Sequence, residues 1–169
     1  MVLTLQVEPR RCILIWQNVK LNEENLNSRE LMEKICSHEQ VSRIITGDPV
    51  RSHINAETSL APAREVFHLD NMAYLCMVYI DRVPADEECL LSANCGPVAV
   101  AYTLWSLEKG YGRRLIMQAR DIIQEPWRFK RLVTLSPKTD MAMKFHLSNG
   151  AKLIAENIHS NNFEYPIDF

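Results

Sequence analysis

The chain has 169 residues, of which 47% are hydrophobic and 24% charged, so it has enough apolar side chains to bury one sizeable core. Its formal net charge of −2 disfavours a protein built mainly to neutralise a nucleic-acid backbone, and we expect no nucleic-acid partner. These bounds predict one α/β (α+β) domain over residues 1–169.

Cysteine usage and the N-terminus indicate the compartment. No C-x-x-C pair occurs, which is typical of free thiols in a reducing compartment rather than of a disulfide scaffold or a zinc site. The scattered cysteines are Cys12, Cys36, Cys76, Cys89 and Cys95. No apolar run reaches about 18 residues, and Glu8 with two arginines interrupts any signal sequence. We therefore expect a cytoplasmic protein without a metal or a membrane partner.

The first third of the chain holds a short apolar stretch, an amphipathic region and a loop. Residues 11–19 (RCILIWQNV) predict a strand. Residues 22–47 carry Asn and Ser at capping positions and apolar residues near helical spacing, which predicts one or two helices. Residues 48–64 contain two prolines and no periodicity, so we expect a loop of the kind that covers a binding site.

The middle of the chain is rich in strand-forming residues. Residues 65–70 and 72–83 carry β-branched and aromatic side chains around Asp70-Asn71, which predicts a hairpin. Residues 89–107 predict a strand, or a strand pair interrupted at 94–97.

The remaining elements alternate between strands and helices. Because strands joined through helices usually pair in parallel, this order predicts parallel strands covered by helices. Pro126 is a stop for the first helix. In chain order we predict a strand at 98–105, a helix at 112–124, a strand at 129–136, a helix at 139–148 and a strand at 151–158.

A glycine loop separates the strand at 98–105 from the helix that follows. Gly110 and Gly112 allow a tight turn whose N–H groups, together with the start of the helix, favour a bound diphosphate. Residues 108–131 contain seven Lys or Arg side chains against three acids, a local charge of +4. The loop is neither a dinucleotide fingerprint, since Leu115 takes the place of its third glycine, nor a P-loop.

The order of elements and the glycine loop resemble the GNAT acyltransferase superfamily. Its loop motif [RQ]-x-x-G-x-[GA] corresponds to residues 107–112 (LEKGYG), with Leu107 in place of Arg or Gln. The resemblance implies a central mixed sheet with a splayed parallel pair flanked by helices, and acetyl-CoA or another acyl-CoA as cofactor. It implies a cofactor site formed by Leu104, Trp105, Leu107, Lys109, Gly110, Tyr111, Gly112, Arg113, Arg114 and Thr139.

A second motif of that superfamily, A-x-x-[FL]-Y-x-x-x-G-[FA], resembles residues 142–151, with His146 where Tyr is usual. Residues 133–157 also resemble the acyltransferase-like domain of malonyl-CoA decarboxylases, which has a T-L-S-P strand end and a later segment close to A..HL.NGA. Here the strand end contains Ser136. Those enzymes carry a long insertion between the two segments, whereas eight residues separate Pro137 from His146.

These resemblances imply three alternative functions. The first is an N-acetyltransferase that moves an acetyl group to a small-molecule or protein amine, with His146 as general acid. The second is a malonyl-CoA decarboxylase-like enzyme that uses Ser136 and His146, and the third is a non-catalytic acyl-CoA-binding module. In the gap between the splayed strands, we expect Ser136 and His146 on either side of the thioester.

The general base of an acetyltransferase is not assigned by any motif. The strand at 98–105 contains no acid, so the candidates are Glu65, His68, Asp81 or a water molecule. The acceptor is equally open, as is a homo-oligomer.

Overall fold

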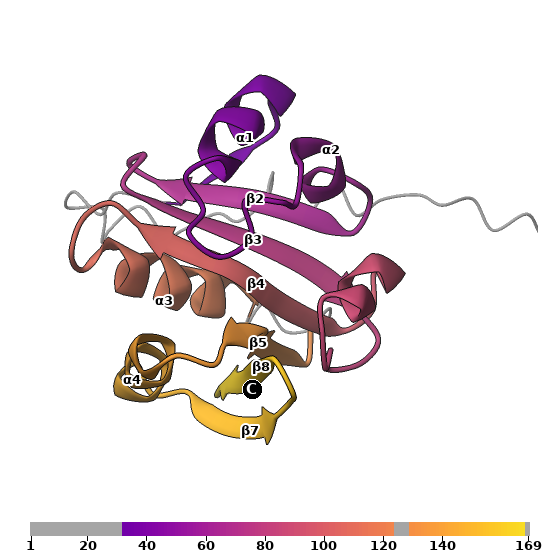
Figure 1. Cartoon of the computed structure of the whole chain (residues 1–169), viewed down its shortest axis with the longest axis vertical. Helices are drawn as coiled ribbons and strands as arrows, with labels where there is room; N and C mark the ends of the chain where they lie inside the picture. The colour runs from indigo at the N-terminus through magenta and orange to yellow at the C-terminus, as the bar shows by residue number, and fades with distance from the viewer. Residues whose placement is uncertain (1–31, 124–128, 168–169) are drawn as a thin grey trace, which may run out of the picture.

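The computed structural model describes residues 32–123 and 129–167, whose strands form one mixed sheet of eight (Figure 1). The strand order is β1-β2-β3-β4-β5-β8-β6, and β7 pairs with β8. The strands are β1 (Glu33–Ile35), β2 (Arg64–Leu69), β3 (Ala73–Ile80), β4 (Val98–Ser106), β5 (Arg131–Thr134), β6 (Ser136–Pro137), β7 (Lys152–Glu156) and β8 (Ser160–Tyr165). The strand expected at 11–19 lies outside the described residues.

Helices cover both faces of the sheet (Figure 1). They are α1 (His38–Ile45), α2 (Ala56–Ser59), α3 (Tyr111–Ile123) and α4 (Asp140–Ser148), with a 3₁₀ helix, η2, at Glu88–Ser92. One core packs α3 against side chains such as Leu75 and Ala101, and the other packs α1 against side chains such as Cys76 and Val100. Successive side chains of a strand point to opposite faces of the sheet, so neighbouring residues such as Leu75 and Cys76 pack in different cores.

The predicted hairpin is confirmed. β2 and β3 pair antiparallel around Asp70 and Asn71, whose φ angles are 52° and 58°. Asp and Asn tolerate this left-handed conformation better than other non-glycine residues, and the Met72 N–H closes the turn by donating to the Leu69 carbonyl at 2.9 Å.

The predicted parallel pair with a splay is also confirmed, and it creates the opening that matters for function. β4 and β5 run parallel and pair from Val98 with Arg131 up to Ala101 with Thr134. β4 continues to Ser106, beyond the last residue of β5. Its pairing with β3 shifts at the same point, so that Tyr102 is an extra, bulged residue of β4. The sheet therefore opens between the end of β4 and the segment that follows β5.

Two sequence predictions for the sheet were wrong. Of the two alternatives for residues 89–107, the interrupted strand pair is wrong, because Glu88–Ser92 forms the 3₁₀ helix η2 and the one strand in this region is β4. The strand expected at 151–158, seen as β7, does not pair in parallel with β5. A strand that we did not predict, β8, lies beside β5 and pairs antiparallel with both β5 and β7.

The helix that follows the splay, α4, begins and ends where its sequence indicates. Thr139 caps its N-terminus by accepting a hydrogen bond from the Ala142 N–H at 3.2 Å. At its C-terminus Gly150 adopts a φ of 84°, and the Ala151 N–H donates to the His146 carbonyl at 3.1 Å. These caps fix which residues of α4 face the sheet.

The structure bears on the state of the cysteines and on membrane-spanning helices. Cys36, Cys76 and Cys89 are free thiols, as expected, whereas Cys95 is disulfide-bonded. Within residues 32–123 and 129–167, no helix combines the length and apolar character needed to cross a bilayer.

Candidate active site

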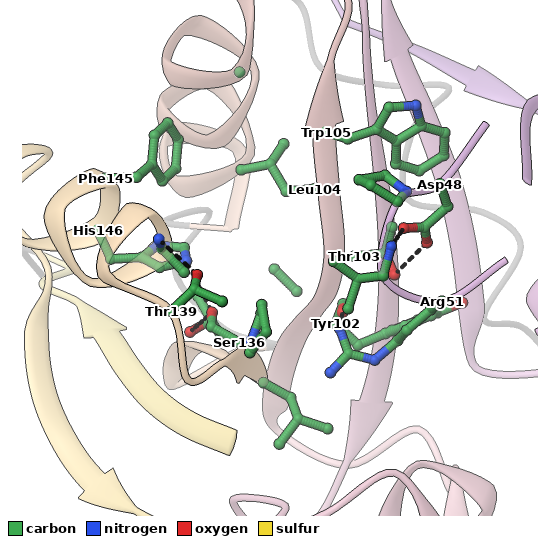
Figure 2. A pocket seen from close by; sticks show the side chains of 18 of the residues that line it. Asp48, Arg51, Tyr102, Thr103, Leu104, Trp105, Ser136, Thr139, Phe145 and His146 are labelled. Atoms are coloured by element: carbon green, nitrogen blue, oxygen red, sulfur yellow. Dashed lines mark hydrogen bonds between the residues drawn. The ribbon is translucent and has the colours of Figure 1, made fainter. Parts of the chain in front are cut away.

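A cavity of about 290 Å³ lies where β4 and β5 separate (Figure 2). Its floor comes from residues 101–106 of β4, one wall from the end of β5, the segment after it and α4, and the other wall from residues 48–51. Side chains from three distant parts of the sequence therefore converge on one opening, as is usual for binding sites at splayed strands.

The first wall, which we name the hydroxyl–imidazole wall, contains Ser136 and His146. Ser136 Oγ lies 2.8 Å from His146 Nε2, and His146 Nδ1 lies 2.9 Å from the Tyr165 hydroxyl. Thr134 Oγ1 lies 3.0 Å from Ser136 Oγ. We expected Ser136 and His146 on either side of a thioester; instead they stand on the same wall and hydrogen-bond directly, because α4 packs its His146 side chain back against the strand end.

His146 is held in one orientation by aromatic contacts. Its ring stacks on Phe163 with centroids 4.7 Å apart and meets the edge of Phe145 at 5.1 Å. Only 6% of the residue is exposed, and this burial lowers the pKa of His146 to about 4. Burial also raises the pKa of Tyr165. At neutral pH the ring is therefore uncharged, with one nitrogen as donor and the other as acceptor.

The second wall, which we name the acid wall, contains Asp48 in the segment between α1 and α2. Asp48 is 6% exposed, yet its carboxylate lines the cavity. It accepts hydrogen bonds from the Thr103 hydroxyl at 3.1 Å and from the Val50 N–H at 2.8 Å. These two donors fix the orientation of the carboxylate.

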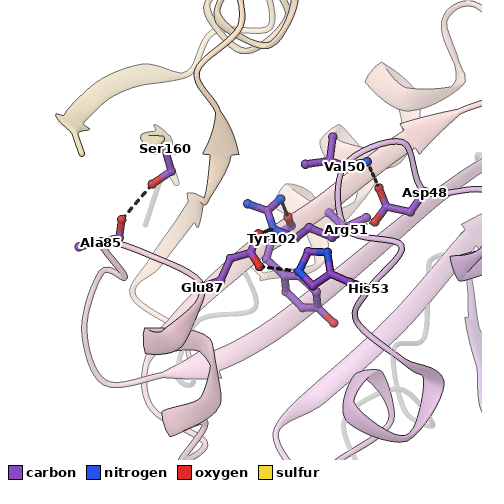
Figure 3. Close-up of polar contacts among 9 residues, drawn as sticks. Asp48, Val50, Arg51, His53, Ala85, Glu87, Tyr102 and Ser160 are labelled. Carbon is purple, nitrogen blue, oxygen red and sulfur yellow. Dashed lines mark hydrogen bonds and ion pairs between the residues drawn. The ribbon is translucent and has the colours of Figure 1, made fainter. Parts of the chain in front are cut away.

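Arg51 ties the acid wall to the sheet (Figure 3). Its Nη1 donates to the carbonyl of Tyr102, the bulged residue of β4, and its Nε donates to Glu87 at 2.8 Å. Glu87 also bonds His53 Nε2 at 2.7 Å. The segment that carries Asp48 is thus held by contacts to two separate parts of the chain.

Sequence reasoning missed Asp48 and Tyr165. The base candidates that it named, Glu65, His68 and Asp81, do not line the cavity. Glu65, on β2, instead forms an ion pair with Lys34 of β1, whose Nζ lies 2.7 Å from Glu65 Oε1. The signal for Asp48 is weak, since a single acid before Pro49 is common in loops, and contacts to distant residues, its own with Thr103 and those of Arg51, hold it at the site.

The residues named for cofactor binding divide into two groups. Leu104, Trp105, Gly112 and Thr139 line the cavity. The remainder, which do not line it, are Leu107, Lys109, Gly110, Tyr111, Arg113 and Arg114.

That second group forms the turn into α3. Gly110 has a φ of 93°, which favours glycine, and Arg114 lies over the Tyr111 ring at 4.8 Å. Lys109 and Arg113 are exposed and do not line the cavity.

Comparison with known proteins identifies the fold. No protein-family model and no curated protein matches the chain. The loading GNATL domain of CurA from Lyngbya majuscula is similar in structure, with a TM-score of 0.58 and 12% identity over 80% of this chain and 98% of that domain. An acetyltransferase from Thermus thermophilus has a TM-score of 0.51 and 14% identity over 80% of this chain and 97% of that one. The chain has the GNAT-like fold.

A malonyl-CoA decarboxylase from Cupriavidus metallidurans also matches, at 16% identity and a TM-score of 0.47. The match covers 63% of this chain and 30% of the decarboxylase, so the chain spans less than a third of that enzyme. This TM-score is too low to assign a shared fold to the matched part.

Proposed function

We propose that the protein is an acyl-CoA-dependent acyltransferase that moves a small acyl group, such as acetyl, to an amine. The observation that carries the proposal is the cavity at the β4–β5 splay, which has a neutral hydroxyl–imidazole wall and, opposite it, a buried acid. A thioester needs hydrogen bonding and proton transfer at its leaving sulfur, whereas an amine needs a group that removes a proton.

The donor side of the proposal rests on β4 and the turn into α3. β4 runs past the end of β5, so its edge from residue 102 to 106 has no β5 partner and can pair with the amide groups of a pantetheine arm. At the end of that edge, the start of α3 and the exposed Lys109 and Arg113 favour the diphosphate of coenzyme A. An acyl-CoA bound this way directs its thioester towards Ser136 and His146.

The acceptor side rests on Asp48. A protonated amine is attracted to this carboxylate, which is already ordered by Thr103 and by the Val50 N–H. Asp48, directly or through one water molecule, takes the proton that the amine must lose before it attacks. An acid on the wall opposite the thioester suits amine acylation.

A second candidate function is the decarboxylation of a malonyl thioester. It is favoured by the Ser136–His146 hydrogen bond, which provides a donor for an enolate oxygen and a proton-carrying ring without requiring any base. The two functions differ in their need for an amine, and therefore in their need for Asp48.

The proposal is tested by calorimetric titration with coenzyme A and by the release of its free thiol from acetyl-CoA with and without a panel of primary amines. Conversion of malonyl-CoA into acetyl-CoA is followed separately by chromatography, because decarboxylation leaves the thioester intact. We expect binding, and amine-dependent thiol release from acetyl-CoA. Acetyl-CoA formed from malonyl-CoA without an amine would favour the second function. Binding without either reaction would indicate a non-catalytic acyl-CoA-binding module, and no binding at all would contradict every acyl-CoA role.

The position of the diphosphate is tested by charge reversal. Arg113→Glu should weaken coenzyme A binding about tenfold or more at low salt, because a like charge then faces the phosphates, and the loss should shrink at high salt. Lys152→Glu, at an exposed lysine of β7 that does not line the cavity, is the matched control and should leave the affinity unchanged.

A further inference from the structure

Ser136 occupies a position that suits a nucleophile. It is the first residue of β6, one residue beyond the end of β5, and its backbone pairs with Asn161 of β8. Its side chain lines the cavity although the residue is only 5% exposed. The strand pairing fixes the backbone, so the hydroxyl has little freedom to leave the cavity wall. A hydroxyl in this setting reacts only if a base removes its proton.

His146 meets the geometric requirement for that base. Its Nε2 lies 2.8 Å from Ser136 Oγ, while its Nδ1 lies 2.9 Å from the Tyr165 hydroxyl. When Nδ1 carries the proton and donates it to the Tyr165 oxygen, the lone pair of Nε2 faces Ser136. Nucleophile, base and orienting group then form a chain in the order used by hydroxyl nucleophiles on other folds.

Thr134 completes the arrangement around the hydroxyl. Thr134 Oγ1 accepts from the Phe163 N–H at 3.1 Å and from the Ser136 hydroxyl at 3.0 Å. Because a hydroxyl can donate or accept, the two hydroxyls can exchange these roles, so that Thr134 donates to Ser136 Oγ. The proton of Ser136 can then point at His146. The neutral state of the ring agrees with this role, because Nε2 then has no proton and can give one to a leaving thiolate only after it has taken one from Ser136.

We propose that Ser136 is a covalent nucleophile that carries the acyl group between coenzyme A and the acceptor. Ser136 Oγ attacks the thioester carbonyl while its proton moves to His146 Nε2. The C–S bond then breaks, and that proton passes to the leaving sulfur, which leaves free coenzyme A and an acyl ester on Ser136. An amine, after losing a proton to Asp48, attacks the ester, and its remaining transferable proton returns through His146 to Ser136 Oγ.

This inference rests on the proposed function, because it requires a bound acyl-CoA. It is tested first on the unaltered protein, with acetyl-CoA and no amine. Mass spectrometry after rapid acid quench should find one acetyl group per chain, in the peptide that contains Ser136. Isotope-labelled free coenzyme A should also exchange into unlabelled acetyl-CoA, because formation of the acyl ester is reversible. Exchange detects the ester even when it is too short-lived to accumulate.

Variants assign the adduct to its residue. Ser136→Ala should abolish both adduct and exchange, and His146→Gln should slow exchange about a hundredfold or more. Ser148→Ala, at an exposed serine of α4, is the matched control and should behave as the unaltered protein. Tyr165→Phe should slow exchange less than His146→Gln, since it removes only the group that orients the ring.

The inference and the proposed function fail in distinguishable ways. If acetyl-CoA binds and an amine releases its thiol, but no adduct or exchange is found, the acyl group passes directly to the amine and Ser136 is not a nucleophile. If neither binding nor thiol release occurs, both proposals are overturned.

Discussion

The two walls of the cavity are stabilised in different ways. The hydroxyl–imidazole wall is made of neutral groups within residues 134–165, packed against aromatic rings. The acid wall carries Asp48, and it depends on Arg51, whose partners are Tyr102 and Glu87. The buried neutral groups Ser136 and His146 are held in one orientation. The Asp48 carboxylate is held by fewer contacts and places a negative charge on the cavity wall, where a substrate can reach it. We assign thioester chemistry to the first wall and the amine to the second.

The largest expected effect is on the hydroxyl–imidazole wall. His146→Gln should lower the rate of acyl transfer about 10²- to 10³-fold, because the ring can no longer accept and return a proton. Steady-state rates at saturating acetyl-CoA measure the loss, and titration should show unchanged coenzyme A affinity. His159→Gln, at an exposed histidine, is the matched control. An unchanged rate for His146→Gln would make this wall purely structural.

The pH dependence of stability reports the burial of the same ring. The pKa of His146 falls from its ordinary value of 6.5 to about 4, so above pH 6.5 the ring is neutral in both folded and unfolded chains. As the pH falls from 6.5 to 4, His146 becomes protonated in the unfolded chain but stays neutral in the folded one. The free energy of unfolding therefore falls by up to about 3 kcal/mol.

Denaturant unfolding at pH 7 and at about pH 4.5 isolates this contribution. The free energy of unfolding should drop more for the unaltered protein than for His146→Gln, while His159→Gln should follow the unaltered protein. Equal drops for all three proteins would mean that His146 is not buried as a neutral ring.

A smaller effect is expected on the acid wall. Asp48→Asn should lower kcat/KM for the amine about 10- to 100-fold, because the amide cannot accept the proton of the amine. The exchange of labelled coenzyme A without an amine should be unaffected, which separates the two walls. Asp121→Asn, at an exposed acid of α3, is the control. Equal losses in both assays would show that Asp48 acts on the thioester step or on folding.

The smallest effect is expected for Arg51, which holds the acid wall to the sheet. Arg51→Ala leaves the Tyr102 carbonyl without its buried donor and should cost about 1–3 kcal/mol of unfolding free energy. It should raise KM for the amine, because Asp48 loses its position. Glu87→Gln removes a half-exposed partner and should cost less than about 1 kcal/mol. If the two variants cost the same, the bond to Tyr102 contributes little.

The sequence predicts one wall much better than the other, for a physical reason. Local signals define α4 and the strand end before it, because Thr139, Gly150 and the apolar and β-branched residues of β5 act within a few residues. The residues Ser136 and His146 therefore appear in the right order and near each other. Asp48 has no local signal, since its position depends on contacts between Arg51 and residues 36 and 51 positions away.

β8 is a second feature that local signals do not reveal. Its sequence, SNNFEY, contains two asparagines and little alternation, so it does not resemble a strand. The strand forms because Asn162 donates to the carbonyls of Pro84 and Thr134 at 2.9 and 2.8 Å, and because Phe163 packs in the core. Tyr165, which orients His146, is at the end of this strand and was missed with it.

The most direct test of the central claim is to map bound coenzyme A by changes in backbone amide NMR shifts. We expect the changes to concentrate on the free edge of β4 at 102–106, the turn at 109–112 and the segment 136–139, in the order in which a pantetheine arm and a diphosphate would lie. Shifts elsewhere on the protein, or none at saturating coenzyme A, would contradict an acyl-CoA site at the splay.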